Sequence, residues 1–344
     1  MSKEIGRNQS FGILLREGVD KVNGYISSEY GDDLSKGAFL WKWTRFIAFS
    51  LTHFTGPDDY FVNRLWRKSR SEINTFITIG KMYKLRKIYN YKGNYKRFSD
   101  KAQFNTFFHD YVKRAWITVD DATDEEIAIF IKNNKKFICK PQSSHGGRGI
   151  MLYHVNDEIN TQTIRQELKG YELEELIIQH DRLQEINPHS VNTLRITTIK
   201  EDDDVHIISA MFRCGTKDAP VDNWSQGGLT AAVDIDTGII FTKAIQKLPR
   251  RRDYVIHPTS GVVLVGFQIP FWEETKQMVY DMASRIDDVR MVGWDMAITN
   301  DGPCVVEGNH SCGTTILSTA DDIGKYKVIK DIRSAYGRKM RRES

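Results

Sequence analysis

The sequence is poor in cysteine and proline and has no long apolar run. Among 344 residues there are four cysteines and eight prolines. The cysteines, at positions 139, 214, 304 and 312, are too few and too scattered for a disulfide framework, so we expect a reducing, cytoplasmic compartment. No uncharged apolar run of 18 residues occurs, and residues 1–10 lack the apolar stretch of a signal peptide. We therefore expect neither a disulfide-stabilised module nor a membrane-spanning segment.

Positive charge is in slight excess but is concentrated in one segment. The chain carries 49 lysines and arginines and 45 acids, a net charge of +4. Between Phe61 and Arg97, eleven cations accompany one acid, Glu72; the segment has a net charge of +10, and the remaining 38 cations and 44 acids give −6. Charge that is so local usually serves a local purpose.

This basic segment, 61–97, also contains Trp66 and several tyrosines. Cations interleaved with aromatic rings suit an anionic glycan, a nucleotide-linked sugar, or an anionic membrane surface that bears lipid-linked sugars. The same pattern suits RNA, although we do not expect nucleic acid as the partner. A solvated helical face is the plain structural alternative.

Hydrophobic periodicity and turn residues predict a mixed α+β chain. Helical patterns dominate the first hundred residues, with an aromatic amphipathic helix over 39–51 and basic helices over 60–91. Further helices are expected over 100–114, 123–133, 162–170, 272–286 and 325–342; Thr123 and Glu126 form a capping box at the start of the second. Strands are expected over 136–139, 150–154, 175–179, 193–200, 205–214, 229–235, 262–267 and 296–307.

The first motif with chemical content is Lys140 followed by a polar glycine loop, 142–149. Backbone amides in such a loop can hold phosphate oxygens, and the lysine adds a positive charge. The Gly-Lys-Ser/Thr ending of a Walker loop is absent, and a strand rather than a helix should follow. A plain β-hairpin is the alternative interpretation.

The second motif is a hairpin whose turn is Asn300-Asp301-Gly302. Asp295 and Glu307 stand six residues before and after Asp301, so they should face each other across the two strands, with Asn309 on the same face as Glu307. Two carboxylates and an amide oxygen suit Mg²⁺, particularly Mg²⁺ shared with nucleotide phosphates. A solvated hairpin face is the alternative.

The third motif places Arg195 and Arg213 on two successive predicted strands, where they alternate with apolar residues. Arginines in such positions can point into a cleft, bind a carboxylate, or stabilise charge on a phosphoryl group in transfer. A salt bridge at the sheet edge is equally compatible with either residue.

In this order the motifs resemble the ATP-grasp superfamily and, within it, the sugar-transfer-associated branch. The resemblance covers about residues 95–320, and its specificity comes from the order of the motifs, with the metal hairpin last. The matching segments are SDK at 99–101, ICKPQSSHGGRGI at 138–150, ELIIQHDRL at 175–183, SVNTLRI at 190–196, VDNWSQGGL at 221–229, HPTSG at 257–261 and GWDMAITNDGPCVVEGN at 293–309.

The resemblance implies an ATP-grasp fold of two α+β lobes that clasp ATP, and it implies roles for nucleotide-binding residues. Lys101 and Lys140 match the lysines that contact the phosphates. Gln179 and His180 match the hinge that holds adenine through backbone groups, with Ile178 or its neighbour Ile177 as an apolar wall. A mobile loop over the phosphates would contain His145, Gly146, Gly147 and Gly149.

The resemblance also implies the chemistry of the second lobe. Asp295, Glu307 and Asn309 match the Mg²⁺ ligands, with Mn²⁺ as the alternative ion. Arg195 and Arg213 match cations that act on the phosphate or the substrate, and they would stabilise an oxyanion.

The implied organisation has four parts: a helical basic region over 1–98, an N-lobe with the glycine loop over 99–186, a C-lobe with the metal hairpin over 187–323, and a basic C-terminal helix over 324–344. Two features depart from the family pattern. A helical basic region stands where many ATP-grasp ligases have an α/β substrate domain. Gly293 stands where some ligases have an arginine, two residues before the first metal ligand.

The expected function is an ATP- and Mg²⁺-dependent carboxylate–amine ligase that forms an amide through an acyl-phosphate. For this branch the implied substrates are an amino acid or small amine and a uronic acid of a capsular or surface polysaccharide, free, nucleotide-linked or lipid-linked. The expected location is the cytoplasm, with peripheral contact at the inner membrane face through 61–97. The alternatives are a phosphotransferase on the same fold and a non-catalytic protein that binds an anionic polymer or membrane.

Overall fold

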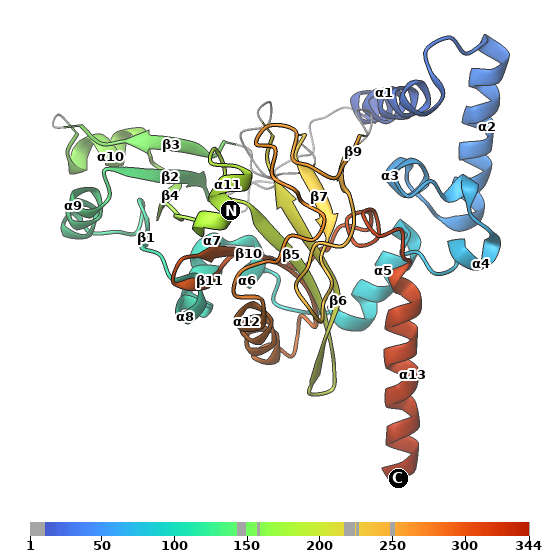
Figure 1. The fold of residues 1–344 in the computed structure, drawn as a ribbon. Coiled ribbons are helices and arrows are strands. Elements are labelled where there is room, and N and C mark those ends of the chain that lie inside the picture. The colour runs from blue at the N-terminus through green and yellow to red at the C-terminus, as the bar shows by residue number, and fades with distance from the viewer. Residues whose placement is uncertain are drawn as a thin grey trace.

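The structure is a computed structural model that describes residues 11–142, 149–156, 159–216, 224, 227–247 and 252–343. Helices near the N-terminus lie at one end of the molecule and a four-stranded sheet lies at the other, with a seven-stranded sheet between them (Figure 1). The mixture of helices and antiparallel sheets confirms the predicted α+β class.

The first part of the chain is helical, as its periodicity predicts. Its elements are α1 (Phe11–Tyr30), α2 (Lys36–His53), α3 (Pro57–Val62), a 3₁₀ turn (Leu65–Arg67), α4 (Arg70–Ile73), α5 (Ile79–Tyr89), α6 (Lys96–Ser99), α7 (Lys101–Phe107) and α8 (His109–Val112). The expected helices over 60–91 and 100–114 are broken into these short pieces. Arg64 has a positive φ of 47°, and Ser69 and Glu72 form a capping box, so the chain turns and starts a new helix twice within ten residues.

The N-lobe is an antiparallel sheet in the order β1-β4-β2-β3, with α9 (Asp124–Asn133) and α10 (Thr161–Glu167) packed against it. Its strands are β1 (Trp116–Thr118), β2 (Lys136–Pro141), β3 (Met151–His154) and β4 (Tyr171–Glu175). The capping box at Thr123 and Glu126 is confirmed: each side chain accepts a hydrogen bond from the other residue's backbone N–H.

The strand expected over 175–179 is wrong, because β4 ends where that strand was expected to begin. Leu173 packs in the N-lobe core, whereas Glu172 and Glu174 alternate with it on the opposite face. The apolar pair at 177–178 mimics a strand, but residues 176–180 form an irregular connection to α11 (Asp181–Ile186).

The C-lobe is an antiparallel sheet in the order β11-β10-β5-β6-β7-β8-β9, with α12 (Trp272–Ser284) packed against one face. Its strands are β5 (Thr193–Glu201), β6 (Asp204–Cys214), β7 (Leu229–Ala232), β8 (Ala244–Gln246), β9 (Asp253–Tyr254), β10 (Met291–Thr299) and β11 (Gly302–Asn309). The strand expected over 262–267 is wrong. Gly261 and Gly266 adopt positive φ values of 77° and 88°, which turn the chain, and only a single bridge, Ile256 to Val263, remains there.

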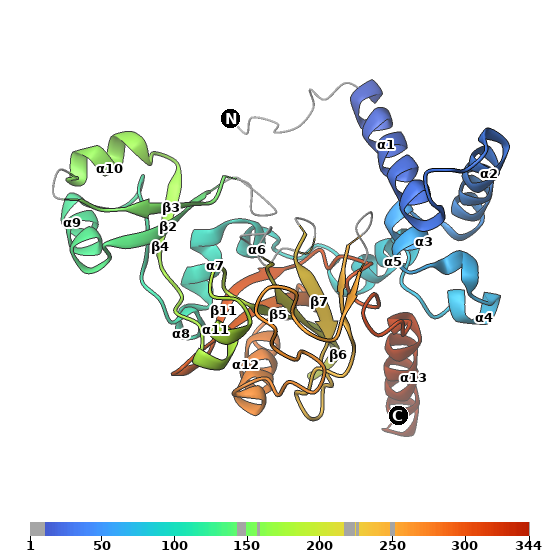
Figure 2. The same cartoon turned by 45° about the horizontal axis from the view of Figure 1, so that its top comes forward.

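The helices before α6 are attached to the C-lobe rather than to the N-lobe (Figure 2). One shared core contains Tyr25, Phe46 and Phe61 together with Trp224 and Ile245 of the C-lobe. A second joins α5 to β5, β10 and α13 (Lys325–Glu343). No helix within the described ranges is long and apolar enough to cross a membrane.

Candidate nucleotide and metal site

The metal hairpin forms as its spacing predicts. Asp295 on β10 pairs with Glu307 on β11, and a bulge follows between Asp295 and Met296. Asn309 donates an N–H from its side-chain amide to Glu307 Oε1 over 3.2 Å, and that amide nitrogen lies 3.5 Å from Asp295 Oδ2. The two carboxylates and the amide therefore converge at one point on the C-lobe sheet.

Both predicted arginines also reach this point. Arg195 lies directly opposite Asp295 on β5 and holds it with two hydrogen bonds, one from Nε to Oδ1 and one of 2.8 Å from Nη2 to Oδ2. Arg213 Nη2 lies 3.2 Å from Asp295 Oδ1 and also donates to the Thr193 hydroxyl over 2.7 Å. Three adjacent strands thus supply a buried carboxylate with two guanidinium groups.

The two carboxyl groups differ in their affinity for protons. Burial alone would raise the pKa of Asp295, but Arg195 and Arg213 outweigh it and hold that pKa at about 2. Glu307 reaches solvent at the edge of the group, yet the surrounding protein and the Asp295 charge raise its pKa. Asp295 therefore stays ionised near neutral pH, whereas the ionised form of Glu307 would be stabilised most by a cation placed beside it.

Gly293 makes room for Arg195. A Cβ atom at position 293 would lie 3.3 Å from Arg195 Cδ, 3.4 Å from Arg195 Nη1 and 3.4 Å from Cys312 Sγ. A side chain at position 293 would therefore crowd the Arg195 side chain, which lies beside Asp295.

The donor set fits Mg²⁺ rather than a metal held entirely by protein. Within the described ranges, no group of three or more His, Cys, Asp or Glu side chains is positioned to hold a metal. Two carboxylates and one amide are what Mg²⁺ uses when substrate phosphates complete its coordination. Asn309 now turns its amide N–H toward the carboxylates, and an asparagine amide can present its oxygen instead by rotating.

The two predicted nucleotide lysines meet around a pair of buried glutamates on β4. Lys140 on β2 donates to Glu174 Oε1 over 2.6 Å, and Lys101, at the start of α7, donates to the Pro141 carbonyl over 2.9 Å. Burial lowers the pKa of Lys101, and the charges of Glu172, Glu174 and, from the other lobe, Glu307 partly offset that effect. Lys101 therefore lies within electrostatic range of the hairpin carboxylate Glu307.

Glu172 and Glu174 are site residues that sequence reasoning missed. Lys140 and Arg114 overcome the effect of burial and lower the pKa of Glu174, whereas burial and the Glu174 charge raise the pKa of Glu172 to about 8. Glu172 Oε1 accepts from Asn105, and Oε2 has no hydrogen-bond partner among the described residues. The Glu-Leu-Glu alternation in 172–174 is the signal that could have revealed a charged face.

Arg114, also missed, connects the two lobes. Its guanidinium donates to Glu174 Oε2 over 2.6 Å and to two carbonyls of β11, Val305 over 2.7 Å and Val306 over 3.2 Å. The side chain is almost fully buried. One cation thus holds the lysine-bearing sheet against the strand that carries Glu307.

The predicted hinge lies between the lobes and is anchored to the metal hairpin. Ile178 is exposed, whereas Gln179 is buried and fixed by hydrogen bonds to Asn187, Ser190 and Asn192. The His180 backbone N–H donates to the Ile298 carbonyl on β10 over 2.7 Å.

Most of the glycine loop, including the predicted phosphate-binding residues His145, Gly146 and Gly147, lies outside the described residues. Gly149 is described: its φ is +74°, and a Cβ there would lie 2.9 Å from Pro141 Cγ. The loop therefore ends on a position that needs glycine, and only Ile150 separates that position from β3.

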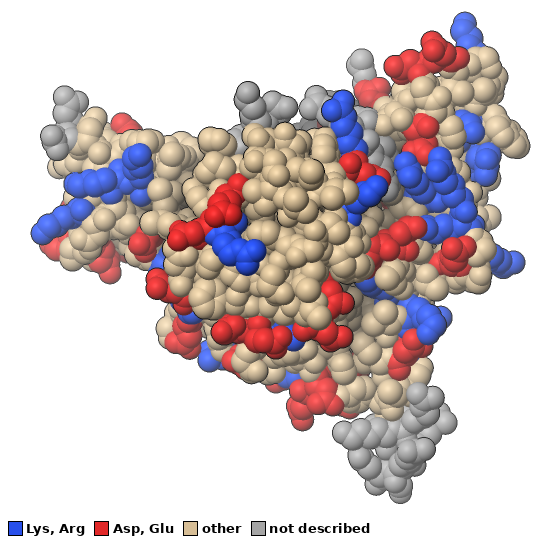
Figure 3. All heavy atoms as spheres, in the orientation of Figure 1, with Lys and Arg blue, Asp and Glu red and all other residues tan. Residues whose placement is uncertain are grey.

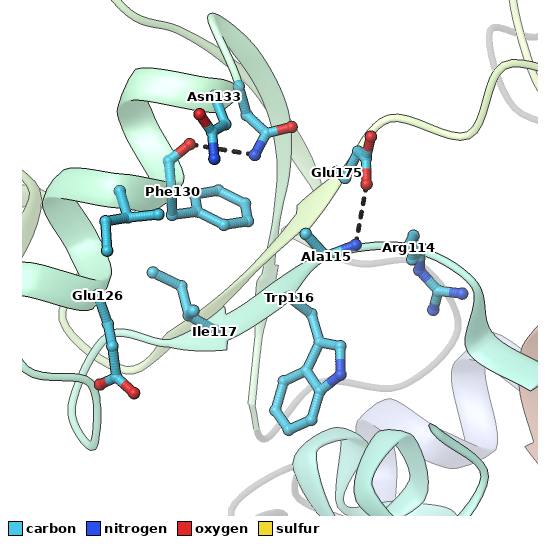
Figure 4. A pocket seen from close by; sticks show the side chains of 10 residues that line it. Arg114, Ala115, Trp116, Ile117, Glu126, Phe130, Asn133 and Glu175 are labelled. Atoms are coloured by element: carbon cyan, nitrogen blue, oxygen red, sulfur yellow. Dashed lines mark hydrogen bonds between the residues drawn. The ribbon is translucent and has the colours of Figure 1, made fainter. Parts of the chain in front are cut away.

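A separate groove of about 600 Å³ runs between α9 and β1 on the outer side of the N-lobe (Figure 4). Its lining includes Trp116, Glu126 and Phe130 and, at one end, Arg114. None of the described residues predicted to hold nucleotide or metal lines it, so we assign it no nucleotide.

An α+β fold of two lobes, with a pair of lysines beside one sheet and a carboxylate hairpin in the other, has the arrangement of an ATP-grasp protein. The chain belongs to the sugar-transfer associated ATP-grasp family, whose model matches residues 81–334. This membership confirms the resemblance stated from the motifs. A search of curated proteins found no match.

Similar solved structures include an N5-carboxyaminoimidazole synthetase from Staphylococcus aureus complexed with ADP (14% identity, TM-score 0.39, 63% of this chain and 46% of that one). An L-amino acid ligase from Bacillus licheniformis is 12% identical, with a TM-score of 0.40 and coverage of 65% and 43%. A D-alanine–D-alanine ligase from Bacillus anthracis is 12% identical, with a TM-score of 0.38 and coverage of 72% and 69%. The chain spans about half the length of the first of these, and likeness this distant does not carry an activity over.

Proposed function

We propose that this protein is an ATP- and Mg²⁺-dependent carboxylate–amine ligase that forms an amide and releases ADP and phosphate. The convergence of Asp295, Glu307 and Asn309 beside Arg195, within electrostatic reach of Lys101, carries this proposal. The cation would be held by the two carboxylates and the Asn309 amide. When bound, it would offset the negative charge of the ATP phosphates.

The first step would join the substrate carboxylate to phosphate. A carboxylate oxygen attacks the γ-phosphorus of ATP, the bond from that phosphorus to the β,γ-bridging oxygen breaks, and ADP leaves with the electron pair. Lys101 and Lys140 would bind and orient the phosphates from the N-lobe side, while Arg195 would face them from the C-lobe. No covalent bond to the enzyme is needed.

The second step would exchange phosphate for the amine. The amine nitrogen attacks the acyl carbon of the acyl-phosphate, the carbon–oxygen bond to phosphate breaks, and the nitrogen loses a proton to give the amide. Arg213, which is held by Thr193, and Arg195 would stabilise the oxyanion of the tetrahedral intermediate. A site sealed between two lobes would keep water from hydrolysing the acyl-phosphate.

The finer assignments rest on the family's association with sugar transfer. We propose an amino acid or small amine and a uronic acid carboxylate as substrates, in assembly of a capsular or other surface polysaccharide in the cytoplasm. The sugar would be free, nucleotide-linked or lipid-linked. We also retain the four-part division of the chain at residues 98, 186 and 323 as a proposal.

The decisive experiment measures ADP release with ATP and Mg²⁺ over a matrix of amines and uronic acids, with products identified by mass. A ligase requires both an acid and an amine. A phosphorylated product formed without an amine would instead establish a phosphotransferase.

Glu307→Ala tests the cation site within the same assay. We expect it to abolish ADP release while leaving the melting temperature near that of the wild type, because Glu307 lies at the edge of the fold. Glu185→Ala, on the exposed face of α11, is the matched control and should remain active. A fully active Glu307→Ala variant would refute the metal assignment. If Lys140→Ala and Asp295→Asn left the activity of the protein unchanged, the result would favour a non-catalytic role.

A further inference from the structure

Four of the eleven cations of the basic segment 61–97 hold the fold together. Arg64 and Arg67 pair with Glu29 at 3.3 and 2.6 Å, and Lys68 pairs with Asp322 at 2.6 Å. Arg97 pairs with Asp288 at 3.0 Å. Cations with such partners contribute less field to an outside ligand, so an outside ligand would be met by the exposed cations of α5, Lys84 and Lys87, rather than by these four.

The helix α2 is apolar on both of its sides. Its inner side packs Phe46, Phe49 and Trp43 into the core that it shares with α1 and α3. Its outer side is exposed and also apolar, and the exposed fractions are 66% for Leu40, 60% for Trp41, 48% for Ile47 and 73% for Leu51. A helix that is hydrophobic all round is normally covered on all sides, and here half of it is not.

These outer side chains form one stripe. Leu40, Ile47 and Leu51 are separated by seven and four residues, so they lie above one another along the helix axis. Phe54, which caps the helix in a left-handed conformation, continues the stripe with 74% of its surface exposed. In Figures 1 and 2, α2 lies at the outer edge of the molecule, away from both sheets.

The stripe continues onto α5. The Gly80 backbone N–H donates to the Phe54 carbonyl over 3.0 Å, which brings the start of α5 against the end of α2. There Ile79 and Tyr83 are 56% and 60% exposed. A groove of about 500 Å³ lies at this junction, and its lining includes Phe54, Tyr83, Lys81 and Lys84 and no acid.

The charges beside this face have one sign. Neither α2 nor α5 contains Asp or Glu, and exposed cations stand beside the stripe: Lys36 and Arg45 on α2, and Lys84 and Lys87 on α5. The nearest acids in sequence are Asp33 before α2 and Asp58 and Asp59 after Phe54; Asp59 is buried and Asp58 pairs with Lys21 at 2.8 Å. In Figure 3 the edge occupied by α2 is mainly tan and blue, with red toward its upper end.

We propose that this face, formed by the exposed side chains of α2 and the start of α5, docks on an anionic phospholipid bilayer. Leu40, Ile47, Leu51 and Phe54 would enter the headgroup–acyl boundary and Trp41 would lie at its level, while the flanking cations meet lipid phosphates. A helix of 18 residues that contains Lys42 and Arg45 lies on a membrane rather than spanning it. This inference does not depend on the proposed ligase activity.

Vesicle flotation with the full chain tests it. We expect binding to vesicles with about 30 mol% phosphatidylglycerol and little binding to pure phosphatidylcholine, because the flanking charges need anionic lipid. Leu51→Glu should weaken binding at least about tenfold, because it places a carboxylate where the acyl chains begin. Leu40→Glu, three turns away on the same stripe, should do the same.

Ile129→Glu on α9 is the matched control, because Ile129 is also an exposed aliphatic residue on a helix, with 59% of its surface accessible. It should bind vesicles as the wild type does. Trp fluorescence supplies a second readout: the emission should shift to shorter wavelength on binding, and the shift should shrink in Trp41→Phe, although that variant still binds.

Three results would overturn the proposal. The first is no binding of the wild type to anionic vesicles. The second is vesicle binding that Leu51→Glu and Leu40→Glu leave unchanged, which would mean that binding depends on charge alone and not on insertion of the apolar stripe. The third is a dimer of the wild type that these two variants convert to a monomer while vesicle binding is absent, which would make a second copy the occupant. Unchanged melting temperatures of the variants keep misfolding from imitating the expected loss.

Discussion

Glu172→Gln should remove a pH dependence from the stability of the protein. Glu172 is fully buried, its carboxyl lies beside that of Glu174, and its pKa is raised from 4.5 to about 8. Between these values the folded chain keeps a proton that the unfolded chain has lost. The free energy of unfolding should therefore fall as pH rises through this window, and Glu172 should contribute no slope below about 4.5.

The size of the effect follows from the width of the window. Each pH unit is worth about 1.4 kcal/mol for one proton, so the interval from 4.5 to about 8 corresponds to on the order of 5 kcal/mol. Gln at position 172 keeps the necessary contacts, because its oxygen can accept from Asn105 and its N–H can donate to Glu174. We therefore expect the variant to resemble the wild type near pH 5 and to be several kcal/mol more stable near pH 8.

Urea unfolding followed by Trp fluorescence, at intervals from pH 5 to pH 8.5, measures this difference. Glu125→Gln, on the exposed first turn of α9, is the control for loss of one carboxylate and should parallel the wild type. Parallel profiles for Glu172→Gln and the wild type would refute the reasoning, because they would mean that Glu172 is ionised in the folded protein.

Other expectations concern the lobe contact, the arginine beside the hairpin, and the thiols. Arg114→Met should lower the free energy of unfolding by about 3–5 kcal/mol, because it leaves Glu174 and two β11 carbonyls short of a donor. The control Arg285→Met, at an exposed pair with Asp110, should lower it by about 1 kcal/mol or less. Equal losses in urea unfolding would contradict the bridging role of Arg114. Gly293→Ala should push Arg195 aside by a few tenths of an ångström and slow ADP release about tenfold without loss of stability, whereas Gly24→Ala, inside α1 with nothing within 4 Å of the added Cβ, should leave ADP release unchanged. Full activity of Gly293→Ala would contradict a role of Arg195 in the chemistry. All four cysteines are free and buried, so a thiol reagent should label none of them in the native protein and four after unfolding, and rapid native labelling would contradict the packing around them.

The hairpin shows how far local rules reach. Asn300-Asp301-Gly302 fixes the turn, and the strand period then fixes Asp295 opposite Glu307, so the meeting of these two carboxylates could be predicted from one short stretch. The same rule failed at β4, because a run of apolar residues after it, 177–178, satisfies the strand pattern without joining a ladder. Periodicity detects burial, and a connection between lobes can be apolar for reasons other than strand pairing.

Arg114 shows what local rules cannot supply. Its partners lie 60 and 191 residues away in sequence, and no local pattern links them. The charge of segment 61–97 is a similar case. Its excess of cations was visible, but the acids that neutralise part of it, Glu29, Asp288 and Asp322, come from distant parts of the chain. Composition gives the charge of a segment, and only the fold gives its field.

The N-terminal helices are fastened to the chain that follows the metal hairpin. Asp59 accepts hydrogen bonds from Gly56, Ile79 and Thr314, and Asn63 accepts one from Thr319. The family-matched region begins at residue 81, inside α5, yet the core of α5 also needs Ile77 from before that point. The region that defines the family is therefore not a unit that can be cut out. Shortening the chain to residue 81 would remove Asp59, the buried partner of Thr314, which lies a few residues beyond Asn309, a proposed cation ligand.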